Sequence, residues 1–234
     1  MQPRTGSWGG IVSTTIQQTD WLSDSSELRS ALAASDFDFM DLKTKACTIY
    51  LVLPLEYLNT HSRFLRLFVN LAVKAASKGG ASKQPVLLVL DEFYSLGTLK
   101  MIADASANIR SYGMKLWPIV QNVGQLIELY GANWQGFVAN AAMTQFFSTN
   151  DPETAQWASE RIGVRPVGEI DPAGNLVGFK LAPLRTAEEI ARETGREGGQ
   201  VLIVREGLDA LVLRRVNYDK EAVCRGSFNP DPDR

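Results

Sequence analysis

Histidine and cysteine are almost absent from this 234-residue chain, and long apolar runs are missing. His61 is the only histidine, which argues against a histidine-centred metal site or a Ser-His-Asp triad. Cys47 and Cys224 form no paired motif, which argues against a disulfide framework or a zinc site and suits a reducing compartment. Apolar runs such as Val86–Leu90 fall far below the roughly 18 residues that span a bilayer. The sequence predicts neither a membrane-spanning segment nor a signal peptide at Met1.

An excess of charge of one sign is also missing. The chain has 24 Lys and Arg against 26 Asp and Glu, a formal net charge of -2. It therefore has no global basic field to hold nucleic-acid phosphates or an anionic membrane surface, and any such contact must be local. Its 45% apolar and 21% charged residues are an ordinary globular composition, long enough for a full core.

From Thr48 onward, short apolar runs alternate with longer stretches of helical period. This alternation is typical of buried parallel strands and their crossover helices. We expect a helix facing a sheet around Phe64–Val73, and another that Asp151 and Pro152 begin and that runs through Arg161. The sequence predicts an open, doubly wound α/β sheet. Its expected strands are Thr48–Leu53, Val86–Leu90, Leu116–Val120 and Thr144–Ser148.

The first 35 or so residues also have helical character. Asp24 and Glu27 have the spacing of a capping box and open an expected helix over Leu28–Ala34. Ser77–Lys83, rich in Gly, Ser and Lys, predicts a crossover loop. Further helices are expected at Leu99–Ser111, ending at Gly113, and at Gln121–Tyr130 and Trp134–Ala142.

The last third of the chain has a different pattern. Gly163–Gly178 is rich in Gly, Pro and Val and has no strong period. Val201–Val204 and Leu211–Val216, on either side of Gly207, predict a β-hairpin. Residues 227–234, with two prolines among Asp and Asn, are expected to be a flexible tail.

The most informative segment is the apolar run Val86–Leu90 followed by Asp91 and Glu92. In a parallel sheet, ligands bind at the carboxyl ends of the strands. A strand that ends in Asp-Glu is the Walker B pattern, in which the first acid holds the magnesium ion of a nucleotide and the second orients or deprotonates the attacking water. The alternative is that Asp91 merely caps the following turn.

Two other side chains fit the same site. Gln121 follows the next expected strand, where an amide can hold the attacking water or sense the γ-phosphate, although a polar residue starting a helix is the alternative. Arg110 lies late on the intervening expected helix and could serve as an arginine finger for a neighbouring subunit. Arg110 equally suits a helix C-terminus through the helix dipole alone.

A phosphate cradle of the Gly-x4-Gly-Lys-Ser/Thr type is missing, because no Gly-Lys dipeptide occurs in the chain. Gly79–Lys83 has some of the same residue types. It precedes an expected strand, however, whereas a phosphate loop follows a strand and opens a helix. We therefore interpret it as a crossover loop.

The spacing of these motifs resembles the type IV secretion and conjugation coupling proteins, the DNA-transfer ATPases of the TraG/TraD kind. The resemblance covers roughly residues 5 to 220 and is densest from Val86 to Ala155. Its motifs are Asp91-Glu92-Phe93, Leu96-Gly97, Arg110-Ser111-Tyr112-Gly113, Leu116-Trp117, Ile119-Val120-Gln121-Asn122, Gln125-Leu126, Leu129-Tyr130-Gly131 and Phe147–Ala155.

The resemblance implies a RecA-like P-loop NTPase fold with ATP and Mg²⁺ as cofactors. By it, Asp91 is the magnesium-associated acid, Glu92 the catalytic carboxylate, Gln121 the γ-phosphate sensor that also contacts the nucleotide, and Arg110 the arginine finger. Residues 1–36 would be a remnant of an all-α insertion domain. Residues 37–226 would be the C-terminal part of the nucleotide-binding domain.

The same resemblance implies a hexameric motor that receives the relaxosome, a relaxase on single-stranded DNA, at the secretion channel. Its place would be the bacterial cytoplasm at the inner membrane, through a transmembrane anchor that this chain does not contain. Hydrolysis would require an N-terminal half that carries Walker A, and the chain alone would be inactive. Two alternatives stay open: a non-catalytic interaction module of the same origin, and a related hexameric DNA translocase outside conjugation.

Overall fold

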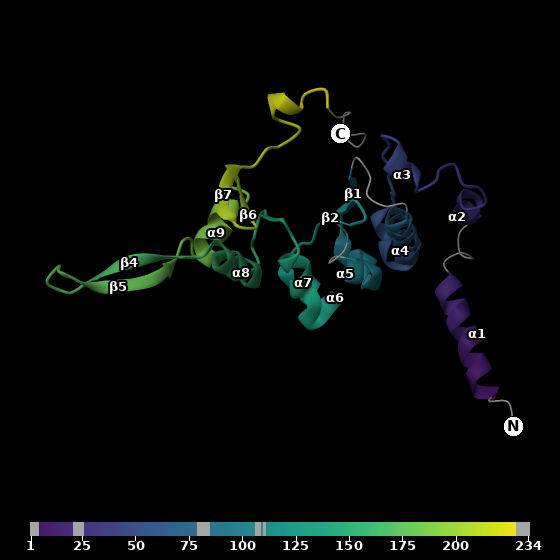
Figure 1. Ribbon diagram of the computed structural model, residues 1–234, viewed down its shortest axis with the longest axis horizontal. Helices are drawn as coiled ribbons and strands as arrows, with labels where there is room; N and C mark the ends of the chain where they lie inside the picture. The colour runs from purple at the N-terminus through teal and green to yellow at the C-terminus, as the bar shows by residue number, and fades with distance from the viewer. Residues whose placement is uncertain (1–4, 21–25, 79–84, 106–108, 110, 228–234) are drawn as a thin grey trace. The chain divides into compact units, whose positions relative to one another are not determined.

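The computed structural model describes residues 5–20, 26–78, 85–105, 109 and 111–227, which fall into two compact units (Figure 1). The first unit runs to Gln121 and includes Gln125–Phe137, and the second comprises Asn122–Gly124 and the chain from Val138 onward. Up to residue 139 the elements are α1 (Thr5–Thr19), α2 (Ser26–Ala31), α3 (Asp41–Thr44), α4 (Leu55–Ser77), β1 (Val86–Leu90), η2 (Phe93–Leu96), α5 (Lys100–Ala105), β2 (Met114–Pro118), α6 (Val123–Tyr130), η3 (Gly131–Asn133) and α7 (Trp134–Ala139).

The first unit is built on two parallel strands. β1 and β2 pair with Val86 opposite Met114 and Leu90 opposite Pro118. Because side chains alternate between the faces of a strand, Val86, Leu90 and Met114 share one face, and all three are buried. On the other face Leu87, Val89 and Trp117 are each about half exposed, at 52%, 50% and 46%. The prediction of buried strands therefore holds for one face of this sheet.

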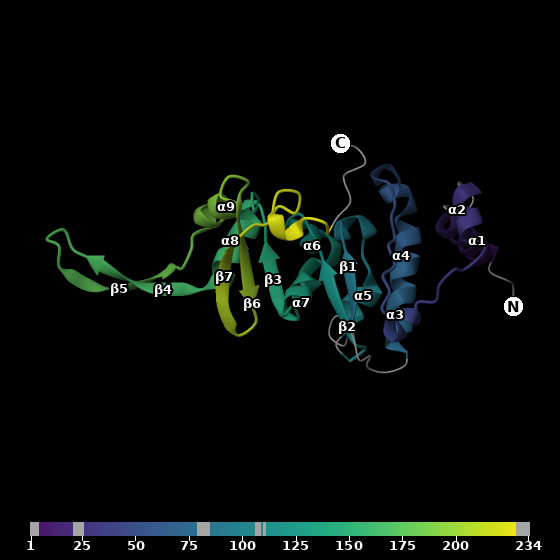
Figure 2. The ribbon, with the colours of Figure 1, turned by 90° about the horizontal axis from the view of Figure 1, so that it is seen from above.

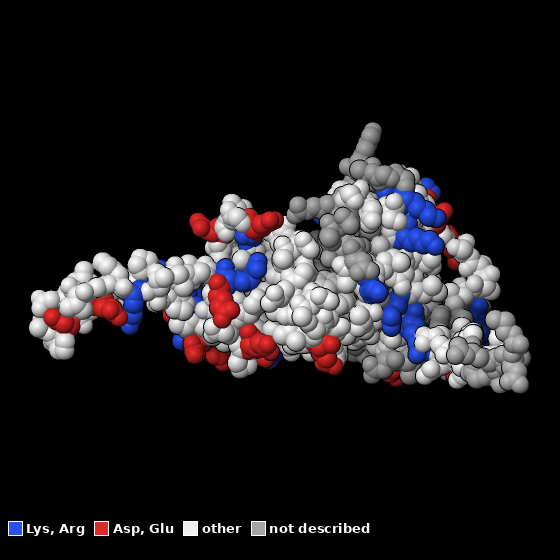
Figure 3. Space-filling model, turned by 60° about the horizontal axis from the view of Figure 1, so that its bottom comes forward, with Lys and Arg blue, Asp and Glu red and all other residues white. Residues whose placement is uncertain are grey.

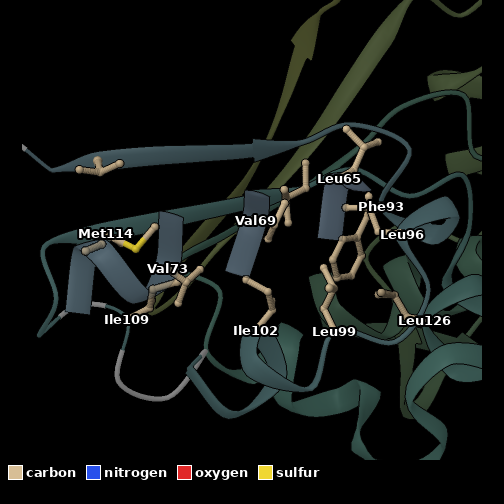
Figure 4. Close-up of a cluster of buried hydrophobic side chains, with 13 residues drawn as sticks. Leu65, Val69, Val73, Phe93, Leu96, Leu99, Ile102, Ile109, Met114 and Leu126 are labelled. Atoms are coloured by element: carbon tan, nitrogen blue, oxygen red, sulfur yellow. The ribbon is translucent and has the colours of Figure 1, made fainter. Parts of the chain in front are cut away.

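One hydrophobic cluster covers the buried face (Figure 4). α4 places Leu65, Val69 and Val73 on one side at a helical spacing of four, as the apolar periodicity predicts. The chain between the strands adds Phe93 and Ile102, whose side chains are fully buried. The two strands are thus fixed by a helix that precedes them and by the connection between them.

The expected strand Thr48–Leu53 is wrong, because residues 46–54 form neither helix nor strand. The side chains still alternate: Leu51 and Leu53 pack against the hydrophobic cluster, while Tyr50 and Val52 are each 82% exposed. A strand requires a neighbouring backbone to complete its ladder. In the described part of the chain this segment has no such ladder, so the period-2 pattern gives an extended segment without strand pairing.

Two further boundaries differ from the sequence prediction. α5 ends at Ala105, while Leu99–Ser111 was expected, and residues 111–113 form a turn in which Gly113 has a φ of 68°. That turn is tightened by the amide of Met114, which donates to the carbonyl of Ile109 over 3.1 Å. β2 ends at Pro118, before the expected Val120, because its partner β1 ends opposite at Leu90 and the chain turns at the left-handed Glu92.

The second unit has its own sheet, in the order β3-β6-β7, with both pairs antiparallel (Figure 2). The expected strands at Val86–Leu90, Leu116–Val120 and Thr144–Ser148 thus belong to two separate sheets: among the described residues, β1 and β2 are the one parallel pair, and β3 pairs antiparallel with β6. The predicted hairpin around Gly207 is confirmed, with a φ of 67° at that glycine. The elements of this unit are β3 (Met143–Phe146), α8 (Pro152–Ile162), β4 (Val164–Ile170), β5 (Leu176–Pro183), α9 (Ala187–Thr194), β6 (Gln200–Arg205), β7 (Leu208–Arg214) and η4 (Ala222–Cys224).

A small core joins α8 and α9 to this sheet. Ala158 and Ile190, one from each helix, are buried with Phe146, Leu202 and Val204 from the strands. The predicted start of α8 is confirmed, since Asp151 is the N-cap and Pro152 lies in the first turn. α9 was not predicted, although Thr186 and Glu189 form the capping box that its sequence permits.

β4 and β5 form a separate two-stranded antiparallel sheet. This hairpin occupies the segment that was expected to be irregular, Gly163–Gly178 and beyond. Its turn is held by the carboxylate of Asp171, which accepts hydrogen bonds from the amides of Ala173 and Asn175 at 2.9 and 2.8 Å. These bonds also lower the pKa of Asp171, because they favour its charged form.

Several predictions fall on residues that the structure does not describe. They are Asp24 of the expected capping box, the loop Gly79–Lys83, Arg110, and the tail beyond Ser227. α2 begins at Ser26 and ends at Ala31, whereas the sequence predicted Leu28–Ala34. Among the described helices, none is long and apolar enough to cross a membrane.

Candidate functional site

Asp91 and Glu92 lie directly after β1, and both are exposed. A carboxylate oxygen of Asp91 accepts a hydrogen bond from the amide of Glu92 at 3.0 Å. Glu92 has a left-handed backbone with φ 48° and ψ 44°, a conformation that costs a non-glycine residue free energy and is concentrated at functional sites. The acid pair therefore lies in a strained turn directly after the strand.

Backbone hydrogen bonds connect this turn to the chain that follows β2. The amide of Ile119 donates to the carbonyl of Leu90 at 3.0 Å, and the amide of Phe93 donates to the carbonyl of Ile119 at 3.1 Å. Leu90 and Phe93, the residues on either side of Asp91 and Glu92, are therefore both hydrogen-bonded to the backbone of Ile119. Gln121 lies two residues after Ile119, so the structure brings all three predicted side chains to one edge of the β1–β2 sheet.

Gln121 is exposed, and its main-chain amide donates to the side-chain oxygen of Gln125 at 3.0 Å. This bond holds the backbone at Gln121 and does not involve the Gln121 side chain. Arg110, the fourth predicted residue, lies outside the described residues, so its role stays a prediction.

An aromatic cluster packs around the residue that follows the turn. Phe93 is fully buried, stacks on Tyr130 with ring centroids 6.1 Å apart and meets Phe137 edge-on. The neighbouring Tyr94 donates its hydroxyl to Glu128 over 2.8 Å. This bond is the main reason that the pKa of Tyr94 is raised. The residues after Glu92 are therefore tied to α6, which immobilises the carboxylates relative to Gln121.

The acids at this edge fit one part of a magnesium nucleotide site. Mg²⁺ is bound through one or two carboxylates, several waters and the substrate phosphates. The exposed carboxylates of Asp91 and Glu92 are of the chemical type that such a site uses. Among the described residues, no group of three or more His, Cys, Asp or Glu could hold a metal alone.

A second polar cluster follows Gln121 in the chain and was missed by sequence reasoning. The amide of Val123 donates to the hydroxyl of Thr154 at 2.9 Å, and that hydroxyl donates to Asp151 at 2.7 Å. The amide of Thr154 donates to the same carboxylate oxygen at 2.8 Å. These bonds lower the pKa of Asp151 because they stabilise its charged form. The sequence signal was the Asp151-Pro152 helix start, which predicted the cap but not its contact with Val123.

The loop after β3 is fixed in a similar way. Arg215 donates to the hydroxyl of Ser148 at 2.9 Å and to the carbonyl of Arg196 at 3.1 Å. Ser148 has a φ of 42°, and the amide of Thr149 donates to the buried hydroxyl of Thr194 at 3.2 Å. Ser148, with its strained backbone, is thus held by Arg215 directly after β7 and lies next to Thr149, which is bonded to the last residue of α9. No local sequence pattern connects residues this far apart.

Comparison with known proteins places the chain in one family. The family described as type IV secretory system conjugative DNA transfer matches residues 1–168 of the chain. The chain belongs to this family. The resemblance that the motifs predict is confirmed.

Curated relatives of the chain agree with this family. The chain is 29% identical over 195 residues to the conjugal transfer protein TraG of Agrobacterium fabrum, an alignment that covers 82% of this chain and 29% of that protein. It is 31% identical over 214 residues to the protein VirD4 of Rhizobium rhizogenes, covering 86% of this chain and 31% of the relative. The chain spans about a third of the length of the curated relatives it matches.

Solved structures confirm the fold. The unbound form of the bacterial conjugative coupling protein TrwB superposes with a TM-score of 0.68 at 18% identity, covering 83% of this chain and 47% of that one. TrwB in complex with ADP and Mg²⁺ gives a TM-score of 0.67 at 17% identity. The predicted α/β class, part of a RecA-like P-loop NTPase fold with a C-terminal hairpin, is therefore shown.

Proposed function

We propose that this chain supplies the magnesium- and water-facing side of the ATPase site of a conjugative DNA-transfer coupling protein. The observation that carries the proposal is the turn after β1, where backbone bonds to Ile119 hold Asp91 and Glu92 beside the segment that leads to Gln121. Support for ATP and Mg²⁺ comes from TrwB, which has been solved with ADP and Mg²⁺ and with nucleotide analogues. When bound, Mg²⁺ neutralises charge on the phosphates.

Each residue has a separate task in this proposal. Asp91 holds the metal ion through its carboxylate, and Glu92 accepts a proton from the attacking water or orients it. Gln121 contacts the terminal phosphate, and Arg110 acts as a finger across a subunit interface. The phosphate cradle must come from elsewhere, because the sequence has no Gly-Lys dipeptide. An N-terminal half carrying Walker A is the partner that this chemistry requires.

The remaining family properties are part of the same proposal. In it the whole protein forms a hexamer at the inner membrane, accepts a relaxase with single-stranded DNA, and passes it to the channel subunits of a type IV secretion system. Support is the family match and the relatives named VirD4 and TraG. The near-neutral net charge permits this role if basic side chains concentrate locally around a pore.

The decisive test changes Glu92→Gln in a protein where this chain is joined to the segment with the phosphate cradle. Because the amide cannot accept the proton, hydrolysis should slow by about 100-fold or more, the scale of general-base loss, while nucleotide binding is retained. Glu56→Gln, an exposed acid in the first turn of α4, is the matched control and should leave both unchanged.

Undiminished turnover in Glu92→Gln would remove Glu92 from the mechanism. The proposed finger has its own test, because Arg110→Ala subunits, inactive alone, should regain hydrolysis when mixed with Glu92→Gln subunits. The two defects lie on different sides of a shared site in that scheme. Failure to complement would favour the dipole interpretation of Arg110.

A further inference from the structure

Gln125, the third residue of α6, has no task in the proposed function, although its side chain is half-buried and bonded to the backbone of Gln121. The amides at the start of a helix have no partner inside that helix. In a capping box, a Glu or Gln at the third helical position reaches back to the amide of the residue that precedes the helix. Gln125 reaches one residue further, past Asn122, and therefore holds the chain at Gln121.

The helix that carries Gln125 is itself bound to the chain that follows the acid turn, which we define as Asp91 and Glu92. Two hydrogen bonds make this connection. The hydroxyl of Tyr94 donates to Glu128 at 2.8 Å, and the hydroxyl of Thr98 donates to the carbonyl of Leu129 at 3.0 Å.

Gln125 and Glu128 lie three positions apart on α6, so their side chains share one side of the helix. Glu128 contacts the chain that leaves the acid turn, and Gln125 contacts the chain that enters α6 from β2. One side of a single helix thus determines how far Gln121 can move from the acid turn.

We propose that Gln125 is a positioning residue for hydrolysis, whose side-chain oxygen sets the place of Gln121 relative to the acid turn. This inference rests on the proposed function, in which Gln121 contacts the terminal phosphate. Residues 119–122 belong to neither helix nor strand, so regular secondary structure does not hold Gln121 in place. Small displacements of a group that acts on the reacting atoms are costly, about 100-fold in rate for a shift of about 1 Å.

The chemistry of the bond selects the variants. A main-chain amide is a donor, so Gln125 must present an acceptor oxygen to it. Gln125→Met keeps the length of the side chain and removes this acceptor, whereas Gln125→Glu retains it. A carboxylate also suits the first turn of a helix. Figure 3 shows acidic as well as basic side chains on one face of the molecule, so one more carboxylate is a small change in the charge of its surface.

Hydrogen exchange at the Gln121 amide tests the bond in the 234-residue chain. Exchange should be about threefold to tenfold faster in Gln125→Met, the factor that corresponds to the net stabilisation by one hydrogen bond. Gln125→Glu should exchange as slowly as the parent. Gln135→Met, at an exposed glutamine in α7, is the matched control and should also leave the rate unchanged.

Kinetics test the consequence in a protein where this chain is joined to the segment with the phosphate cradle. Gln125→Met should lower kcat by about tenfold and change KM for Mg-ATP by less than about twofold, because the proposed contact of Gln121 acts mainly in the transition state. Gln125→Glu should restore kcat to within about twofold of the parent. In a Gln121→Ala background, Gln125→Met should have no further effect, since no side chain is left to position.

A general structural role for Gln125 predicts a different result, namely a loss of activity by the same factor in both backgrounds. That result, or an unchanged exchange rate at Gln121 in Gln125→Met, overturns the inference and leaves the proposed function standing. A Gln121→Ala protein that hydrolyses ATP like the parent instead overturns the proposed task of Gln121, and this inference with it.

Discussion

The hydroxyl of Thr154 offers a sharp test of how the chain after Gln121 is held. It accepts from the amide of Val123 at 2.9 Å and donates to Asp151 at 2.7 Å. Thr154→Val removes both bonds with little change in shape. The helix cap itself survives, because the Thr154 amide still donates to Asp151. The substitution therefore isolates the connection between α8 and the start of α6.

The expected cost follows from the two groups that lose a partner. Val123 is only 3% exposed, so its orphaned N–H costs about 1–2 kcal/mol, and loss of the hydroxyl bond to a partly solvated carboxylate adds about 1 kcal/mol. We therefore expect the free energy of unfolding to fall by about 2–3 kcal/mol. Thr154→Ser keeps the hydroxyl and should cost less than about 1 kcal/mol.

Urea denaturation followed through Trp157 measures this change, because that side chain lies on α8 and packs against Phe146 with ring centroids 5.3 Å apart. Hydrogen exchange at the Val123 amide should accelerate in Thr154→Val and remain slow in Thr154→Ser. A loss below about 0.5 kcal/mol, with unchanged exchange at Val123, would refute the reasoning. It would mean that water replaces the hydroxyl at no cost.

Two further predictions follow from local geometry. Hydrogen bonds from Thr154 lower the folded pKa of Asp151, so this carboxylate stabilises the fold above its unfolded pKa of about 3.9 and loses that contribution as pH falls through the lower folded value. Asp151→Asn should flatten the acid limb of a stability-against-pH curve, and an unchanged limb would contradict the assignment. Gly163 has φ 98° and ψ -168°, a region nearly exclusive to glycine, so Gly163→Ala should lower the melting temperature and cost about 1–3 kcal/mol. Gly136→Ala, inside α7 with open space around it, should instead stabilise by about 0.5–1 kcal/mol, and equal effects at both glycines would contradict the strain argument.

The sequence predicted elements whose signals are local. α4 and α8 follow from apolar periodicity and from the Asp151-Pro152 start, and the β6–β7 hairpin follows from two apolar runs around Gly207. Boundaries were less certain where a ladder or a turn decides them. β2 ends at Pro118 because β1 ends opposite it, and the segment 48–53 has the strand pattern without the strand.

The candidate site divides in the same way. Asp91, Glu92 and Gln121 were predictable, because an acid or amide after an apolar run identifies the end of a strand in one sequence window. The left-handed backbone of Glu92 and the two bonds through Ile119 were not, because they depend on which strand lies beside β1. The same holds for Thr154, whose contact with Val123 crosses 31 positions.

The sequence by itself determined the α/β class, the acid pair that ends β1 and the family, since these depend on short patterns and their order. Only the tertiary structure decided which strands pair, which sheet faces stay exposed to solvent and which loops are held by hydrogen bonds from distant residues. β3 pairs antiparallel with β6, and β4 and β5 form a two-stranded antiparallel sheet in a segment with no clear period. Pairing and burial depend on contacts between distant residues, whose free energy no local pattern records.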